Sequence, residues 1–238
     1  MDLQEHIFYQ KKYFETNEKK SMQPRPSAYI KRQVERVIEA GQLTKKERLI
    51  DIGCGIGKYT IELLKQGYRV EGLDIAEGLL QQLQNHNQTG VPLPLHCADI
   101  AHPPEALSGQ YDAAIGFFAL HHMFDLDRAF QGIAKILKPK GKLIFLEPNP
   151  YNLLYYLQIL LTPKMTWKGD KGILKMRPRL LFPALKRAGF LHPAVDRSGF
   201  FPPFLTDLKG GVALEKKLEK FPLWKPLLPF QLFTAQKG

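Results

Sequence analysis

Cysteine is scarce in this sequence. Only Cys54 and Cys97 occur among 238 residues, with no Cys-x-x-Cys pair and no cluster with histidine. Two cysteines cannot form the disulfide framework of a small secreted domain, and no ligand spacing typical of zinc is present. We therefore expect a protein of a reducing compartment, the cytoplasm, without a metal site.

Long hydrophobic runs are also missing. The longest apolar stretch, from Leu153 to Leu161, is interrupted by Gln158. It is far shorter than the roughly 18 residues that a membrane span needs. The N-terminal segment MDLQEHIFYQKKYF lacks the apolar centre of a secretory signal. The sequence thus predicts neither a membrane-spanning helix nor a signal peptide.

Acidic residues are outnumbered by basic ones. The chain has 34 Lys and Arg against 23 Asp and Glu, a formal net charge of +11. A basic balance favours anionic partners such as nucleic acid, phosphorylated molecules or acidic lipid. The lysines occur in scattered pairs rather than in one long run, so we interpret them as a solvated surface and do not expect nucleic acid as a partner.

The apolar content of 44% is typical of a globular protein, and its pattern changes along the chain. Residues 1–46 are charged and mostly helical in pattern. From Arg48 to Glu147, short apolar runs alternate with helical segments, and we expect a helix from Lys58 to Gln66 and a fifth strand in KLIFLE. A sixth strand is predicted over residues 193–199, and a last apolar run, PFQLFTAQK, lies near the C-terminus. Such alternation predicts a parallel sheet with helices on both faces.

The segment LIDIGCGIGKYT, residues 49–60, places a glycine-rich turn between a strand and a helix. Asp51 lies near the strand end, and Gly53, Gly55 and Gly57 follow at alternate positions. Glycines permit positive φ and close approach of a ligand, and the next helix offers free N–H groups. The dinucleotide fingerprint needs its third glycine one position later, and the phosphate-binding loop needs Ser or Thr after Gly-Lys, so neither motif fits.

Two further acids end the next two strands. Asp74 closes RVEGLD about twenty residues after the glycine turn, where an acid can bind a ribose diol. It can also cap the helix that begins near Ala76. Asp99 closes the third strand, where its carboxylate can accept a hydrogen bond from an adenine amino group while Ile100 packs on the ring. A turn-forming role is the alternative for Asp99.

These segments together resemble the class I S-adenosylmethionine-dependent methyltransferases, in the small-molecule "type 11" and quinone-biosynthesis C-methyltransferase branch. The resemblance is carried, over residues 48–150, by LIDIGCGIG, GLDIA, CADI, YDAAIGFFALHHM and LKPKGKLIFLEPNP. It implies an α/β, Rossmann-like, doubly wound and mostly parallel seven-stranded sheet with helices on both faces and an antiparallel last strand. Within one structural domain we expect an N-terminal helical cap (1–46), the S-adenosylmethionine-binding core (47–150), substrate-side inserts with the remaining sheet elements (151–228) and the C-terminal strand (229–238).

The resemblance also implies the residues that bind the cofactor, S-adenosyl-L-methionine. The glycine turn and the acid before it would hold the methionine part, and backbone near Phe117 would face the methionine amino group. Asp74 would bind the ribose, with Ile75 against adenine, and Asp99 and Ile100 would bind adenine. The full predicted set is Asp51, Gly53, Cys54, Gly55, Gly57, Asp74, Ile75, Asp99, Ile100 and Phe117.

Catalytic groups are harder to predict, because the sulfonium of this cofactor is already an activated methyl donor. His121 and His122 follow the fourth strand at the reacting edge of the fold. We take His122 as the candidate general base, with a packing role as the alternative. Glu147 and Asn149 end the fifth strand on the same edge, where they either line the acceptor site or form a turn with the neighbouring prolines.

Two inserts follow the fifth strand. Residues 151–162 are apolar almost all round a helix, which must be buried, form a lid or touch lipid. Lys164, Lys168, Lys171 and Lys175 follow it, and residues 200–228 mix Phe and Trp with Lys and Pro. We expect a small hydrophobic or lipid-like acceptor and peripheral contact with an anionic membrane, with plain core packing as the alternative. Methylation of RNA or protein, and a catalytically silent binding protein, stay open as other functions.

Overall fold

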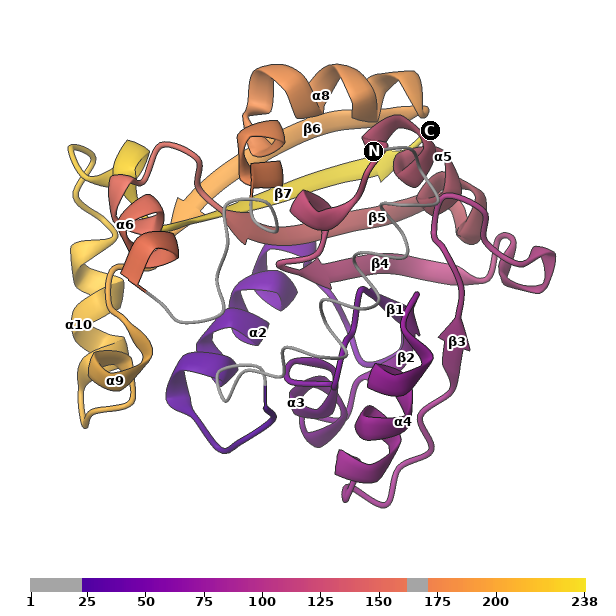
Figure 1. Ribbon diagram of the computed structural model, residues 1–238, viewed down its shortest axis with the longest axis horizontal. Coiled ribbons are helices and arrows are strands. Elements are labelled where there is room, and N and C mark those ends of the chain that lie inside the picture. The colour runs from indigo at the N-terminus through magenta and orange to yellow at the C-terminus, as the bar shows by residue number, and fades with distance from the viewer. Residues whose placement is uncertain (1–22, 162–170) are drawn as a thin grey trace.

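A computed structural model of the protein describes residues 23–161 and 171–238. Its strands are β1 (Arg48–Ile52), β2 (Arg69–Asp74), β3 (Leu95–Cys97), β4 (Tyr111–Phe117), β5 (Leu137–Pro148), β6 (Phe190–Ser198) and β7 (Phe230–Lys237). They form one seven-stranded sheet in the order β3-β2-β1-β4-β5-β7-β6 (Figure 1). The pairs from β3 to β5 are parallel, and β7 runs antiparallel to β5 and to β6. The predicted fold is confirmed.

Helices cover both faces of this sheet. The α-helices of the described residues are α2 (Ala28–Gly41), α3 (Thr60–Lys65), α4 (Glu77–His86), α5 (Leu126–Ile136), α6 (Leu153–Leu161), α8 (Pro178–Arg187), α9 (Pro203–Thr206) and α10 (Gly211–Leu218). Apolar side chains of α5 and α8 pack in one buried cluster, and those of α2, α3 and α4 pack in a second. Along β5, Leu143 and Phe145 join the first cluster and Ile144 and Leu146 the second, because successive strand residues point to opposite faces.

Three element boundaries differ from the sequence prediction. The fifth strand begins at Leu137 rather than within KLIFLE, because Lys138 precedes a proline and is held in extended backbone. The helix predicted from Lys58 begins only at Thr60, after the glycine turn. The sixth strand begins at Phe190, three residues before the predicted start. A register shift between Leu191 and Ala194 interrupts its alternation and hides that start.

Two predictions concern segments that the structure describes only in part. The segment of the helical cap before residue 23, and Lys164 and Lys168, lie outside the described residues. Within the described ranges no helix combines the length and the apolar character that a membrane crossing requires.

A buried ionic cluster holds α10 against α2. Nη2 of Arg36 lies 3.0 Å from Oε2 of Glu215 and also contacts Glu219. Oε1 of Glu215 accepts hydrogen bonds from the backbone N–H groups of Phe200 and Phe201, at 2.9 and 3.0 Å. One buried glutamate therefore fixes both a helix and the chain that follows β6, which positions the second insert on the N-terminal helix.

Replacing Glu215 by alanine should destabilise the protein strongly. The substitution removes the more deeply buried of the two glutamates that pair with Arg36, and it leaves the N–H groups of Phe200 and Phe201 without their acceptor. Breaking a buried ion pair in this way typically costs about 3–5 kcal/mol. Urea denaturation followed by circular dichroism measures the free energy of unfolding. The neighbouring exposed residue gives the control, because Lys216→Ala should change that free energy by less than about 0.5 kcal/mol. Equal effects of the two substitutions would contradict the structural role of the cluster.

Candidate functional site

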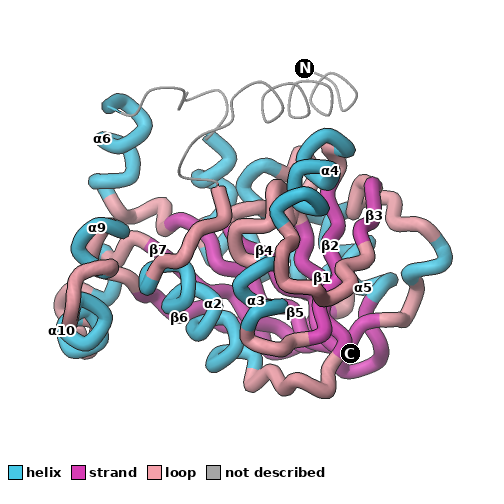
Figure 2. Tube along the Cα trace, turned by 90° about the horizontal axis from the view of Figure 1, so that it is seen from below, coloured by secondary structure: helices cyan, strands magenta, loops and turns pink. Residues whose placement is uncertain are grey.

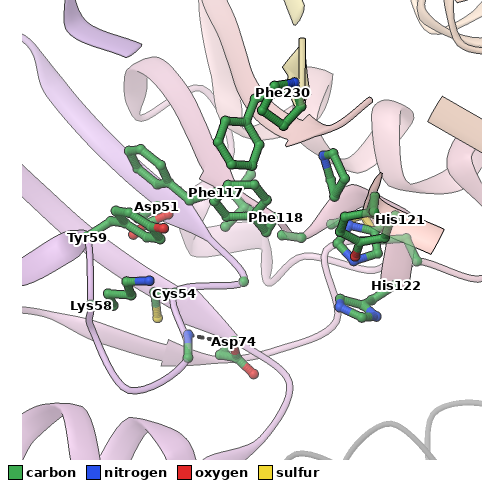
Figure 3. A pocket seen from close by; sticks show the side chains of 18 of the residues that line it. Asp51, Cys54, Lys58, Tyr59, Asp74, Phe117, Phe118, His121, His122 and Phe230 are labelled. Carbon is green, nitrogen blue, oxygen red and sulfur yellow. Dashed lines mark hydrogen bonds between the residues drawn. The ribbon is translucent and has the colours of Figure 1, made fainter. Parts of the chain in front are cut away.

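A cavity of about 1030 Å³ lies at the carboxyl ends of the parallel strands. It sits where β1 and β4 are neighbours, which is the point where the strand order reverses and where ligands bind in open α/β sheets. Figure 3 shows side chains of β1, β2, β4 and the following loops around it. The predicted site residues that line it are Asp51, Gly53, Cys54, Gly55, Asp74, Ile75, Asp99, Ile100, Phe117 and His122. Gly57 is the predicted residue that does not.

The three glycines of the turn do different work. All have positive φ, between 52° and 86°. A Cβ on Gly57 would lie 1.9 Å from Leu83 of α4, and one on Gly53 would lie 2.6 Å from Ala119. A Cβ on Gly55 would meet nothing within 4 Å. Gly53 and Gly57 therefore permit close packing, whereas Gly55 faces open space in the cavity.

Asp51 is buried at the cavity wall. Its Oδ2 accepts a hydrogen bond from the hydroxyl of Thr60 at 2.6 Å, and its Oδ1 has no hydrogen-bond partner among the described residues. Burial raises the pKa of Asp51 to about 7, and the nearby carboxylate of Asp74 acts in the same direction. A buried carboxylate oxygen without a partner is suited to a cationic ligand group.

Asp74 and Asp99 both bind the backbone around the cavity. Asp74 accepts hydrogen bonds from the N–H groups of Gly55 at 2.9 Å and Ala76 at 3.0 Å, so it ties the glycine turn to the start of α4. Asp99 accepts from the N–H of Ala101 at 2.9 Å, which is the turn-forming role. Each carboxylate oxygen keeps a further lone pair. The predicted roles toward ribose and adenine are compatible with these bonds and stay predictions.

Glu147 organises the loop after β4. It is fully buried, and its Oε1 accepts hydrogen bonds from the N–H groups of Ala119 and Leu120 at 2.9 and 2.8 Å. Its Oε2 lies 2.6 Å from Nδ1 of His121. These bonds stabilise a turn in which Phe118 has a φ of 59°, a rare conformation for a non-glycine residue.

The two alternatives left open for the end of β5 are thereby decided. Glu147 and Asn149 do not line the cavity. The side-chain amide of Asn149 donates to the carbonyl oxygens of Pro226 and Leu228, at 2.9 and 2.7 Å, and so holds the chain before β7. Both residues therefore hold the backbone of neighbouring loops and do not line the cavity.

The structure distinguishes the two histidines. Both line the cavity, and their ring centroids lie 3.9 Å apart. His121 is the one that a buried carboxylate orients. With the hydrogen on Nδ1 directed at Glu147, its Nε2 is the basic atom, an arrangement that suits a general base. The role of His122 as general base stays a prediction.

An aromatic wall and a lysine were missed by the sequence analysis. Tyr59 stacks on Phe117 with ring centroids 4.4 Å apart, and Phe118 meets Phe230 edge to face at 5.3 Å. Nζ of Lys58 lies 5.0 Å from the Tyr59 ring centroid and makes no ion pair with the described residues. Burial lowers the pKa of Lys58 to about 8. The Gly57-Lys58 pair was the available sequence signal for the lysine. The aromatic wall could not be predicted, because its rings come from segments far apart in sequence and meet only in the fold (Figure 3).

Comparison with known proteins identifies the central part of the chain. Residues 50–145 match the family model for a methyltransferase domain, and that range contains the glycine turn and the acids at the ends of β1, β2 and β3. Residues 50–145 form a class I S-adenosylmethionine-dependent methyltransferase domain. The cofactor of this domain is S-adenosyl-L-methionine.

Relatives of the methyltransferase domain cover part of the chain. The ubiquinone biosynthesis O-methyltransferase of Chromobacterium violaceum is 26% identical over 134 residues, which are 56% of this chain and 54% of the relative. An S-adenosyl-L-methionine-dependent Diels-Alderase of Talaromyces variabilis is 27% identical over 122 residues, 50% of this chain and 42% of the relative. The chain thus spans about half the length of the curated relatives it matches.

A solved structure supports the fold over most of the chain. The S-adenosylmethionine-dependent methyltransferase from Thermotoga maritima, a possible histamine N-methyltransferase, superposes with a TM-score of 0.60 at 17% identity. The match covers 88% of this chain and 92% of that one. At this identity the likeness shows the fold alone.

The residues around the cavity fit S-adenosyl-L-methionine chemically. The cofactor carries cationic ammonium and sulfonium groups, and the unpartnered Oδ1 of Asp51 is a matching acceptor. The open space at Gly55 leaves room for a ligand against the backbone. Asp74 has lone pairs for a ribose diol, and the buried side chain of Ile100 offers an apolar surface for adenine.

Replacing Gly55 by valine should remove cofactor binding from a folded protein. The side chain would enter the cavity without displacing protein atoms, so the cost to folding is the strain of a positive φ, about 1–2 kcal/mol. Calorimetry with S-adenosylhomocysteine should show no binding. Gly109→Val is the matched control, because Gly109 has a φ of 63°, has equally open surroundings and does not line the cavity. Equal affinities of the two variants would show that the ligand stays away from Gly55.

Cofactor affinity should depend on pH through Asp51. Its pKa of about 7 in the folded chain lies above the ordinary 3.8, so the ligand-free protein protonates this carboxyl as pH falls below 7. A protonated carboxyl does not attract a cation, so the Kd of S-adenosylhomocysteine should rise by up to about tenfold per pH unit below 7. Asp51→Asn should flatten this dependence, whereas Asp127→Asn, outside the cavity, should keep it. A slope that persists in Asp51→Asn would assign it to another group.

The same group should influence folding in the opposite direction. Between about pH 4 and 7 the folded chain binds a proton at Asp51 that the unfolded chain does not. The contribution of Asp51 to stability is therefore fully present at low pH and is lost as pH rises toward 7. Comparing the unfolding free energies of wild type and Asp51→Asn across this range isolates the contribution.

Proposed function

We propose that the protein transfers the methyl group of S-adenosyl-L-methionine to a small hydrophobic acceptor whose reacting atom loses a proton. The observation that carries this proposal is the continuity of the cavity. Asp51, Asp74 and Ile100 line one part of it, and residues of both inserts line the rest. A donor and an acceptor held in one cavity react as if they belonged to one molecule.

The acceptor side of the cavity is apolar. Its lining includes Leu153, Leu154, Phe200, Phe201, Trp224, Leu227 and Phe230. Enclosing an apolar group among such side chains stabilises the complex by about 25 cal/mol for each Å² removed from water. The Chromobacterium violaceum relative is named a ubiquinone biosynthesis O-methyltransferase, and this supports a small-molecule acceptor.

Proton removal falls to His121 in this proposal. The bound cofactor supplies a methyl group on a sulfonium, which the acceptor atom takes up. Glu147 holds Nδ1 of His121 at 2.6 Å, so Nε2 can accept the proton that the acceptor gives up. The aromatic wall beside the reacting atoms offers an apolar surface that excludes water.

Mass spectrometry of a cell extract incubated with the protein and cofactor tests the proposal. A hydrophobic compound should gain about 14 Da, the mass of one CH₂ group, in a cofactor-dependent manner. If S-adenosylhomocysteine binds but no compound gains this mass, the protein is a binding protein or a non-methylating enzyme, as the Talaromyces variabilis relative is by name. Mass gain on RNA or protein instead would assign a macromolecular acceptor.

The two histidines can be separated once an acceptor is known. His121→Gln should lower kcat about 10²–10⁴-fold, the usual contribution of a general base. His122→Gln, on the adjacent residue, should affect kcat much less. Steady-state kinetics at several pH values measures both, and the reverse order of effects would return the role of base to His122.

A further inference from the structure

Exposed apolar side chains gather at one end of the molecule. We call them the apolar rim, which consists of Tyr151, Leu153, Leu154, Leu157, Phe200, Phe204, Leu208, Leu214, Phe221, Leu223, Trp224 and Leu227. In both views of the whole chain, α6, α9 and α10 lie at this end (Figures 1 and 2). In the described part of the chain, other large apolar side chains of similar exposure are scattered, at Val91, Phe124, Leu180 and Leu191.

The exposure of the rim is high. Leu223 is 86% exposed, Leu153 78% and Phe204 70%. Elsewhere the same chain buries its large apolar side chains in two clusters against the sheet. So many exposed apolar side chains at one end of the molecule are uncommon on a protein that has no partner for them.

Charge separates around the rim. Glu215 of α10 and Glu219 just after it point inward, since their side chains are 1% and 13% exposed and pair with arginines of α2. The carboxylate of Asp207 accepts hydrogen bonds from Ser27 and from the N–H of Tyr29. The lysines point outward: Lys209, Lys216, Lys217 and Lys220 are exposed and make no ion pair with described residues. The outer surface of this insert is therefore both apolar and positive.

The cavity opens within the rim. Leu153, Leu154, Phe200, Trp224 and Leu227 belong to the exposed set and also line the cavity. A molecule that enters between them stays in contact with apolar side chains throughout. This is the geometry expected of a site that takes its ligand from an apolar phase.

We propose that the apolar rim and its lysines dock the protein on an anionic lipid surface, with the cavity mouth facing the lipid. The rim side chains enter the interfacial layer, and the nearby lysines are attracted to acidic headgroups. A second copy of the chain fits less well, because a two-fold contact over this face would bring the lysines of both copies together.

Co-sedimentation with vesicles tests the proposal without cofactor or acceptor, so its outcome is independent of methyl transfer. The wild-type chain should sediment with vesicles of equal parts phosphatidylcholine and phosphatidylglycerol, and less with phosphatidylcholine alone. Raised salt should weaken the difference. Wild-type protein that stays in the supernatant with both vesicles would overturn the proposal.

Two double variants test the two components of the rim. Phe204→Ser with Leu223→Ser removes apolar contact, and Lys216→Glu with Lys217→Glu reverses charge, and none of these residues lines the cavity. Each should lower the partition coefficient onto the acidic vesicles at least about tenfold. Leu180→Ser with Lys186→Glu makes the same kinds of change on α8 and should sediment like wild type.

Two further results would contradict docking on lipid. Rim variants that are folded by circular dichroism and sediment like wild type would overturn the proposal. So would light scattering that shows a wild-type dimer which Phe204→Ser with Leu223→Ser dissociates, since the rim would then be an interface between two copies.

Discussion

The site depends on the turn after β1, in which every second residue, Gly53, Gly55 and Gly57, has a positive φ. Gly57 lets Leu83 of α4 approach the backbone, Gly53 does the same for Ala119, and the N–H of Gly55 is then aimed at Asp74. The ends of β1, β2 and β4 and the start of α4 thereby meet around one space. A side chain at either packing glycine would separate these elements before any ligand is considered.

Two buried carboxylates fix further segments of the chain around the site. Glu147 and Glu215 do not touch the cavity, yet each gathers backbone N–H groups and a basic side chain from segments that would otherwise be loosely held. Glu147 fixes the loop that carries both histidines, and Glu215 fixes the chain that carries Phe200. A buried charge is strongly destabilising when one of its partners is missing. Loss of a partner of either acid should therefore disturb both the fold and the shape of the cavity.

Much of the cofactor side could be predicted from sequence, because its residues lie at strand ends and parallel strands end at one edge. Asp51, Asp74 and Ile100 needed only the register of strands and turns. The link between Glu147 and His121 could not be found, since it joins β5 to the loop after β4, which only the finished sheet brings together. The same holds for Lys58, whose Nζ lies over the rings of Tyr29 in α2 and of Tyr59, and Tyr59 in turn stacks on Phe117 of β4. The proposed domain boundaries and the roles of individual site residues stay predictions.

The position of β7 has a consequence for how the chain reaches its fold. This strand lies between β5 and β6 although it follows both in sequence. Until Phe230–Lys237 has been made, β5 has an unpaired edge and β6 has no place in the sheet. A nascent or truncated chain therefore presents an open apolar strand edge to other chains, which is the kind of surface that aggregates. Strands β1 to β5 can pair with one another without β7, whereas β6 can join the sheet only after Phe230–Lys237 is present.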